Sequence, residues 1–270
     1  MRFFLRGLAS GFVLLAMAAP QYANGQMQPY PDRQGDESPS RPDAAEQLFA
    51  LANQARADLR LGRLAWDPAL AEAALAHCRL MARKGPIAHQ YQGEPDLSDR
   101  AAQAGAHFSL IEENVAVGPT AAAIHDEWMH SPGHRDNLLN AQVNRLGVAV
   151  VFSHGVLYAV EDFSEAVLPL KANQVEAQVA SLIRPSGVSV LDEVAAARAA
   201  CRTSSGLPRD PHGREPRFVM RWQSADLKRL PQVLVQKLGS GQYHEAAVGG
   251  CPAQNQNSAF TAYRVAVLLY

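Results

Sequence analysis

Two adjacent runs of apolar, β-branched residues place the strongest constraint on the fold of this 270-residue chain. Residues 146–152 (LGVAVVF) and 156–163 (VLYAVEDF) have the composition of β-strands. Ser153-His154-Gly155 lies between them, and a short glycine-containing connection between two such runs indicates a β-hairpin. The chain is therefore expected to build a sheet that contains this hairpin.

The segment before the hairpin has helical periodicity. Apolar residues recur at spacings of three and four, and Asp43 with Glu46 forms a capping-box pattern at the start of the first helix. A second helix starts at Asp67, with Pro68 in its first turn. The predicted helices cover residues 44–60, 67–85, 98–104 and 120–130. Helices on both sides of a strand group predict an α+β fold with α–β–α layers over residues 44–165.

The last third of the chain, residues 166–270, shows a second mixture of patterns. We expect a small α+β extension in which no motif carries a recognisable chemistry. Its predicted helices lie near 171–183 and 189–200, and its strand-like runs lie at 217–223, 232–238 and 259–269.

The chain has three cysteines, Cys78, Cys201 and Cys251. Thiols of an exported chain meet an oxidising compartment and tend to pair. Cys201 and Cys251 both lie in the predicted extension, whereas Cys78 lies in an apolar helical stretch. We therefore predict a Cys201–Cys251 disulfide and a buried free thiol at Cys78.

The N-terminus has the features of an export signal. Two arginines and an apolar stretch lie within residues 2–19, and Ala23-Asn24-Gly25 offers the small residues that a signal peptidase reads. We predict a signal peptide over residues 1–25, cleaved before Gln26, with an uncleaved N-terminal anchor as the alternative. Cleavage predicts a secreted protein, extracellular or periplasmic, with no stable membrane span.

Residues 26–43 are polar and rich in proline, which predicts a disordered linker. The whole chain carries 25 Lys and Arg against 26 Asp and Glu, without a basic run. Phosphate binding needs clustered cations, so nucleic acid is excluded as an expected partner.

Three polar motifs lie at predicted loops or helix ends, where functional side chains project from a scaffold. They are Ile87-Ala88-His89, Glu112-Glu113-Asn114-Val115-Ala116, and residues 128–139 (WMHSPGHRDNLL). Two imidazoles and a carboxylate are a set that Zn²⁺ can use with water at an open position. The same groups could act as a general acid and base.

The three motifs, taken in this order, resemble those of the CAP superfamily. This superfamily comprises the cysteine-rich secretory proteins, antigen 5 and the pathogenesis-related proteins, and its domains are also called SCP-like. The resemblance is to the bacterial type. The third motif resembles the family's Trp and Ser-x-Gly-His-Arg-x-Asn signature, and the second resembles its Glu-Asn-Ile-Ala box. Further similar pieces are Asn53-Gln54-Ala55-Arg56, Leu64-x-Trp66-Asp67-Pro68-x-Leu70, Leu146-Gly147-Val148-Ala149 and Tyr158-Ala159-Val160-Glu161-Asp162-Phe163. The resemblance covers about 120 residues and implies a CAP-type α-β-α sandwich.

The resemblance also implies a cavity lined by two histidines and two glutamates. His89 and His134 match the histidines, and Glu113 matches the first glutamate. Ser131 stands where the second glutamate is expected, and Glu127 leaves its helix in a different direction. Three of the four family residues are therefore present, which weakens the case for a tightly held metal.

The remaining polar residues of the motifs have structural interpretations. Asn114 is expected to hydrogen-bond within the fold, and Trp128 is expected to pack in the core. His77, His107, His125 and His130 are expected to be surface or packing histidines.

Three functions follow from these observations. The resemblance implies a non-enzymatic binding module for an extracellular protein, lipid or sterol. The second function is a metal-dependent hydrolase of peptides or cell-wall material, which the cluster of His89, Glu113 and His134 suggests. The chain has neither of two common hydrolase motifs, His-Glu-x-x-His and Gly-x-Ser-x-Gly. The third is a structural envelope role carried by residues 166–270.

Overall fold

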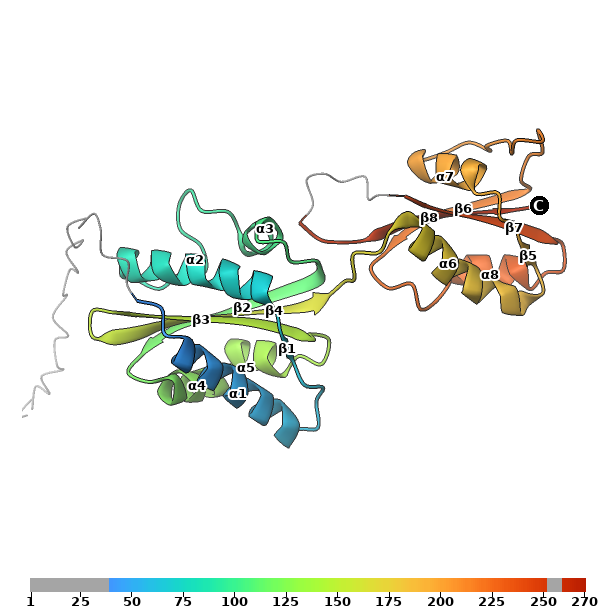
Figure 1. Ribbon diagram of the computed structural model, residues 1–270. Helices are drawn as coiled ribbons and strands as arrows, with labels where there is room; N and C mark the ends of the chain where they lie inside the picture. Colours follow the sequence, from blue (N-terminus) through green and yellow to red (C-terminus); the bar gives the residue numbers. More distant parts are fainter. Residues whose placement is uncertain (1–38, 252–258) are drawn as a thin grey trace, which may run out of the picture. The chain divides into compact units, whose positions relative to one another are not determined.

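The computed structural model describes residues 39–251 and 259–270, and these contain two four-stranded sheets with helices on both faces of each (Figure 1). Mixed helices and strands in these layers confirm the predicted α+β fold. The predicted signal peptide and most of the predicted linker lie outside the described residues. Within the described ranges, none of the helices combines the length and the apolar character needed to cross a bilayer.

The first sheet has the predicted hairpin at its centre, and its strand order is β1-β3-β4-β2. The hairpin strands β3 (Arg145–Ser153) and β4 (Val156–Ala166) pair antiparallel, which confirms the prediction. On the outer side of β4, strand β2 (Phe108–Gly118) pairs antiparallel with it. The two-residue β1 (Ala65–Trp66) pairs parallel with β3.

Helices cover both faces of this sheet (Figure 1). One face carries α1 (Pro42–Asp58), α4 (Ala121–His130) and α5 (Pro132–Leu139), packed around fully buried side chains such as Trp128 and Ile124. The other face carries α2 (Pro68–Lys84) and α3 (Leu97–Gln103). The buried apolar residues of these elements contact the strands directly, so the sheet is buried on both sides.

The start of α2 follows the prediction, and the start of α1 does not. The carboxylate of Asp67 accepts hydrogen bonds from the backbone N–H groups of Ala69 and Leu70, so Asp67 is the N-cap of α2. Asp43 does not cap α1, because the helix begins at Pro42 and the Asp43 carboxylate pairs with Arg41. Residues 40–43 therefore belong to the fold rather than to the predicted linker.

Two further corrections concern the segment that carries the polar motifs. The Glu112-Glu113-Asn114 motif lies within strand β2 rather than in a loop, since hydrogen-bonded pairing with β4 outweighs its polar composition. Pro132 begins α5 instead of only ending α4, because proline fits the first turn of a helix.

The second sheet has the strand order β5-β7-β8-β6. Helices α6 and α8 contribute to the hydrophobic cluster on one face, and α7 contributes to the cluster on the other (Figure 1). The elements are α6 (Ala172–Ile183), the 3₁₀ turn η1 (Arg184–Ser186), β5 (Ser189–Val190), α7 (Ala195–Arg202), β6 (Phe218–Ser224), α8 (Gln232–Leu238), β7 (Glu245–Cys251) and β8 (Tyr263–Leu269).

Two predictions for this part of the chain were wrong, and one strand was missed. Residues 232–238 form α8 rather than a strand, because Leu234 and Leu238 are buried at a spacing of four residues. The segment 189–200 is divided into strand β5 and helix α7, and β7 was not predicted. Strand β7 is rich in alanine and glycine, which are residues with low strand propensity.

The two sheets share one topology. In each, a two-residue first strand pairs parallel with the third strand, the third and fourth strands pair antiparallel, and the second strand pairs antiparallel with the fourth. Along the chain, α1–β1–α2–β2–α4–β3–β4 corresponds to α6–β5–α7–β6–α8–β7–β8. The C-terminal segment therefore repeats the topology of the first sheet and its helices.

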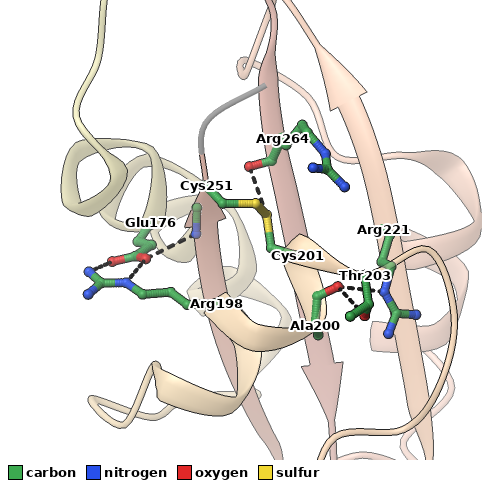
Figure 2. Close-up of a disulfide and its surroundings, with 9 residues drawn as sticks. Glu176, Arg198, Ala200, Cys201, Thr203, Arg221, Cys251 and Arg264 are labelled. Atoms are coloured by element: carbon green, nitrogen blue, oxygen red, sulfur yellow. Dashed lines mark hydrogen bonds and ion pairs between the residues drawn. A yellow bond between two sulfur atoms is a disulfide. The ribbon is translucent and has the colours of Figure 1, made fainter. Parts of the chain in front are cut away.

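The structure contains the expected disulfide between Cys201 at the end of α7 and Cys251 at the end of β7 (Figure 2). The Sγ atom of Cys201 also lies 3.4 Å from the carbonyl oxygen of Arg264 on β8. Cys78 is free and buried, and burial raises the pKa of its thiol to about 12. Cys78 is therefore an inert packing residue.

Candidate functional site

His89 and Glu113 lie together on the face of the first sheet that α2 and α3 cover. His89 comes from the loop between α2 and α3, and its Nδ1 lies 2.8 Å from Oε1 of Glu113. The side chain of His89 is 60% exposed, whereas that of Glu113 is only 2% exposed. The imidazole of His89 is therefore accessible to solvent, while the carboxylate that it contacts is buried.

Arg100 of α3 completes this arrangement, and sequence reasoning did not identify it. Its Nη2 donates to Oε2 of Glu113, and its Nη1 donates to the backbone carbonyl of His89 at 3.1 Å. Arg100 is itself buried. One guanidinium thus holds both the carboxylate and the loop that carries the imidazole.

His77 of α2, which is fully buried, also holds the loop that carries His89. Its Nδ1 lies 2.6 Å from Oε1 of Glu94, and its Nε2 lies 2.8 Å from the carbonyl oxygen of Ala88. A carbonyl oxygen only accepts, so Nε2 of His77 carries a hydrogen. The other Glu94 oxygen accepts from the backbone N–H of Tyr91. His77 is thus a packing residue that anchors the loop of His89.

His134 stands in the first turn of α5, on the other side of β2. Its backbone carbonyl accepts a hydrogen bond of 3.1 Å from Nδ2 of Asn114, which is fully buried. Asn137 of α5 donates in turn to Oδ1 of Asn114 at 3.0 Å and to the carbonyl of Glu113 at 3.1 Å. Asn114 and Asn137 thus join α5 to strand β2.

The two histidines have opposite electrostatic environments. The hydrogen bond to Glu113 raises the pKa of His89, against a smaller opposing effect of burial. Burial lowers the pKa of His134, and the charge of nearby His89 lowers it further, while Glu127 opposes both effects. As pH falls, His89 therefore becomes protonated before His134.

Unlike Asn114, Ser131 and Glu127 contribute little to this geometry. Ser131 separates α4 from α5, and its side chain caps neither helix. Glu127 is exposed, and its effect on His134 is electrostatic: its charge raises the pKa of the imidazole. Neither residue supplies the second carboxylate that the family resemblance implies.

The described residues do not fit a zinc centre. Among them, no group of three or more His, Cys, Asp or Glu side chains is placed to share a metal ion. Glu113 explains this, because one oxygen already accepts from Arg100 and the other faces Nδ1 of His89. A metal ion would have to displace a buried guanidinium to reach that carboxylate.

Two acidic residues of β4 were not singled out from the sequence. Glu161 and Asp162 are fully buried, and within the described residues none of their four carboxylate oxygens has a hydrogen-bond partner. Burial raises the pKa of Glu161 from 4.5 to about 8. Burial, followed by the charge of Glu113, also raises the pKa of Asp162. Their presence within the apolar run 156–163 of β4 was the signal that could have identified them.

Comparison with known proteins gives a family match, curated relatives and solved structures. The model of the cysteine-rich secretory protein family, CAP, matches residues 49–163. The chain is 33% identical over 109 residues to the uncharacterized membrane protein YlbC of Bacillus subtilis (strain 168), which covers 39% of this chain and 31% of that protein. It is 31% identical over 121 residues to the uncharacterized protein YkwD of the same organism, which covers 44% of this chain and 47% of that protein.

The chain thus spans less than half the length of these two curated relatives. Among solved structures, an extracellular protein containing a SCP domain from Bacillus anthracis str. Ames is 31% identical, with a TM-score of 0.42. That match covers 46% of this chain and 40% of the other.

Proposed function

Because this chain belongs to the CAP family through residues 49–163, we propose that it is an exported, non-enzymatic binding module for a protein, lipid or sterol ligand. We place the CAP domain at residues 44–165 and treat residues 166–270 as an extension to it. Membership of a fold family does not by itself assign an activity, so the proposal depends on the site.

One observation carries the non-enzymatic part of the proposal: both oxygens of Glu113 are engaged, by Arg100 and by His89. A general base needs a carboxylate or imidazole that can take a proton from substrate or water. Glu113 is committed to an ion pair, which leaves the exposed side of His89 as a group that donates or accepts hydrogen bonds to a ligand.

Export is supported by the N-terminal signal pattern and by the disulfide. Disulfides persist in oxidising compartments and are rare in the cytosol. The Cys201–Cys251 bond and the predicted cleavage before Gln26 therefore support the same location.

A lipid or sterol ligand is supported by an apolar groove at one edge of the first sheet, lined by residues of α1, β1, α2 and β3. The groove has a volume of about 340 Å³ and lies beside β3. Its apolar walls include Ala45, Trp66, Leu75, Val148 and Val150. Trp66 is 40% exposed, so its indole is available to a ligand.

The metal hypothesis leads to a direct prediction. Zn²⁺ added to the purified protein is expected to leave its melting temperature unchanged, because Glu113 is already occupied, and a bound metal would raise it. Thermal unfolding is measured beside His134→Ala, and cleavage of labelled casein is measured in the same samples. A zinc-dependent stabilisation that is lost in His134→Ala, together with cleavage, would support the hydrolase instead.

The groove leads to a prediction about ligand class. Phosphatidylcholine vesicles containing cholesterol are expected to shift the protein's tryptophan fluorescence to shorter wavelength, because Trp66 would enter an apolar environment. Trp66→Phe should lose this change, while the buried Trp128 and the half-buried Trp222 remain in the variant as references. If neither plain nor cholesterol-containing vesicles alter the spectrum, a protein ligand remains.

A further inference from the structure

We propose that Glu161 and Asp162 are positioning residues for the two histidines of the site, Asp162 acting on His89 through Glu113 and Glu161 acting on His134 through Asn114. The inference concerns the same site as the proposed function. Its readout is the tautomer of the His89 imidazole and the amide exchange of α5 rather than ligand binding, so either proposal can fail while the other holds.

The pairing of β2 with β4 supplies the geometry. Glu113 lies directly opposite Asp162, and Asn114 lies directly opposite Glu161. Directly opposed residues of antiparallel strands have Cβ atoms about 4.5–5.5 Å apart. Consecutive strand residues point to opposite faces. The Glu161-Asp162 dipeptide therefore contacts one site residue on each face of the sheet.

Asp162 acts on the face that α2 and α3 cover. The charged and titratable groups around it are Glu113, which opposes it, and Arg100, which pairs with Glu113. An ionised Asp162 would place a second negative charge beside Glu113 without a partner, which is costly at full burial. The register places the Asp162 carboxyl group beside Glu113, and the inference requires its O–H to point at the Glu113 carboxylate as a third donor beside Arg100 and His89.

Glu161 acts on the face that α4 and α5 cover. Asn114 is the polar side chain opposite it, and its amide holds the His134 carbonyl at 3.1 Å. Among the described residues, neither carboxyl oxygen of Glu161 has a hydrogen-bond partner, and both are buried. A carboxyl group there limits the rotation of the Asn114 amide, and the amide in turn holds the first turn of α5.

The second sheet is an internal control for this interpretation. The short parallel strands set the alignment: Trp66 pairs with Leu146 in the first sheet, and Val190 pairs with Ala246 in the second. Leu146 then pairs with Phe163, and Ala246 with Leu269. One row further along, Glu113 and Asp162 correspond to Val219 and Leu268, and in the next row Asn114 and Glu161 correspond to Met220 and Val267.

The faces agree with this alignment. Val219 and Leu268 belong to the cluster under α7, as Glu113 and Asp162 lie under α2 and α3. Met220 and Val267 belong to the cluster with α6 and α8. Strand β8 is apolar from Val265 to Leu269, so the same topology is built without acids at the positions of Glu161 and Asp162. Burying two unpaired carboxyl groups costs stability and is not required by the fold, so we assign them to the site.

The experiment replaces each acid by its counterpart from the second sheet and by its amide. In the full-length protein, Asp162→Leu is expected to free the His89 imidazole, so that its ¹⁵N shifts move from a single tautomer towards the average of two, while α5 is unchanged. Glu161→Val is expected to speed amide exchange in α5 about tenfold, while His89 is unchanged. Asp162→Asn and Glu161→Gln keep a donor or acceptor and should retain the wild-type signals.

Each outcome decides the inference. Wild-type signals for His89 and α5 in the two apolar variants would overturn it. Loss of native circular dichroism in those variants would also overturn it, because the internal control requires the sheet to accept apolar residues there. Equal changes at both histidines in every variant, the amides included, would indicate general loosening rather than positioning.

Discussion

Replacement of Glu161 by glutamine is expected to stabilise the folded protein by roughly 3 kcal/mol at pH 7 and to have little effect near pH 4. In the unfolded chain this carboxyl group ionises near pH 4.5, whereas in the folded protein its pKa is about 8. Between these values the folded state binds the additional proton, so stability falls as pH rises. Glutamine keeps the polar shape and removes the titration.

Urea unfolding of both proteins at pH 4, 6 and 8 measures this effect. The difference in unfolding free energy should grow with pH over that range. Glu165→Gln is the matched control, since Glu165 lies on the same strand but is only half-buried and accepts from Ser109. A difference that is the same at all three pH values would contradict a neutral buried Glu161.

Hydrophobic periodicity was sufficient to predict those elements whose signal is local. The β3–β4 hairpin follows from two adjacent runs of apolar residues, and the cap of α2 follows from Asp67 itself. Both signals extend over only a few residues. Strand β2 and helix α8 depend on tertiary pairing and packing instead. The polar Glu112-Glu113-Asn114 run is a strand because β4 lies beside it, and the valines of α8 are helical because Leu234 and Leu238 face a core.

The candidate site divides in the same way. Motif resemblance identified His89, Glu113 and His134, because those residues belong to short ordered patterns. It could not identify Arg100 or Asp162, since each reaches Glu113 only after α3 and β4 have packed against β2. The sequence also could not show that Glu113 is unavailable to a metal ion, because the cation that pairs with it is Arg100, and α3 lies outside the motifs.

Removal of the Cys201–Cys251 disulfide is expected to destabilise the second sheet by about 4 kcal/mol, from the loop entropy of a separation of 50 residues. The first sheet should keep its stability. The measurement compares native-state hydrogen exchange of wild type with the Cys201→Ala, Cys251→Ala double variant, following amides of β7 and β8 against amides of β3 and β4. Cys78→Ala is the control for loss of a buried sulfur without loss of a cross-link.

The composition of the core beneath α7 explains why this face of the second sheet depends on a cross-link. That cluster is built mainly from alanine, and its buried members are Ala196, Ala197, Ala200, Cys201, Ala247, Ala266 and Leu268. Alanine buries little apolar area, so the hydrophobic contribution of this face is small. The corresponding cluster under α2 contains Met81, Val115 and Val160 and leaves its cysteine free. The cross-link thus stabilises the face with the smaller side chains, and equal loss of protection in both sheets would contradict this division.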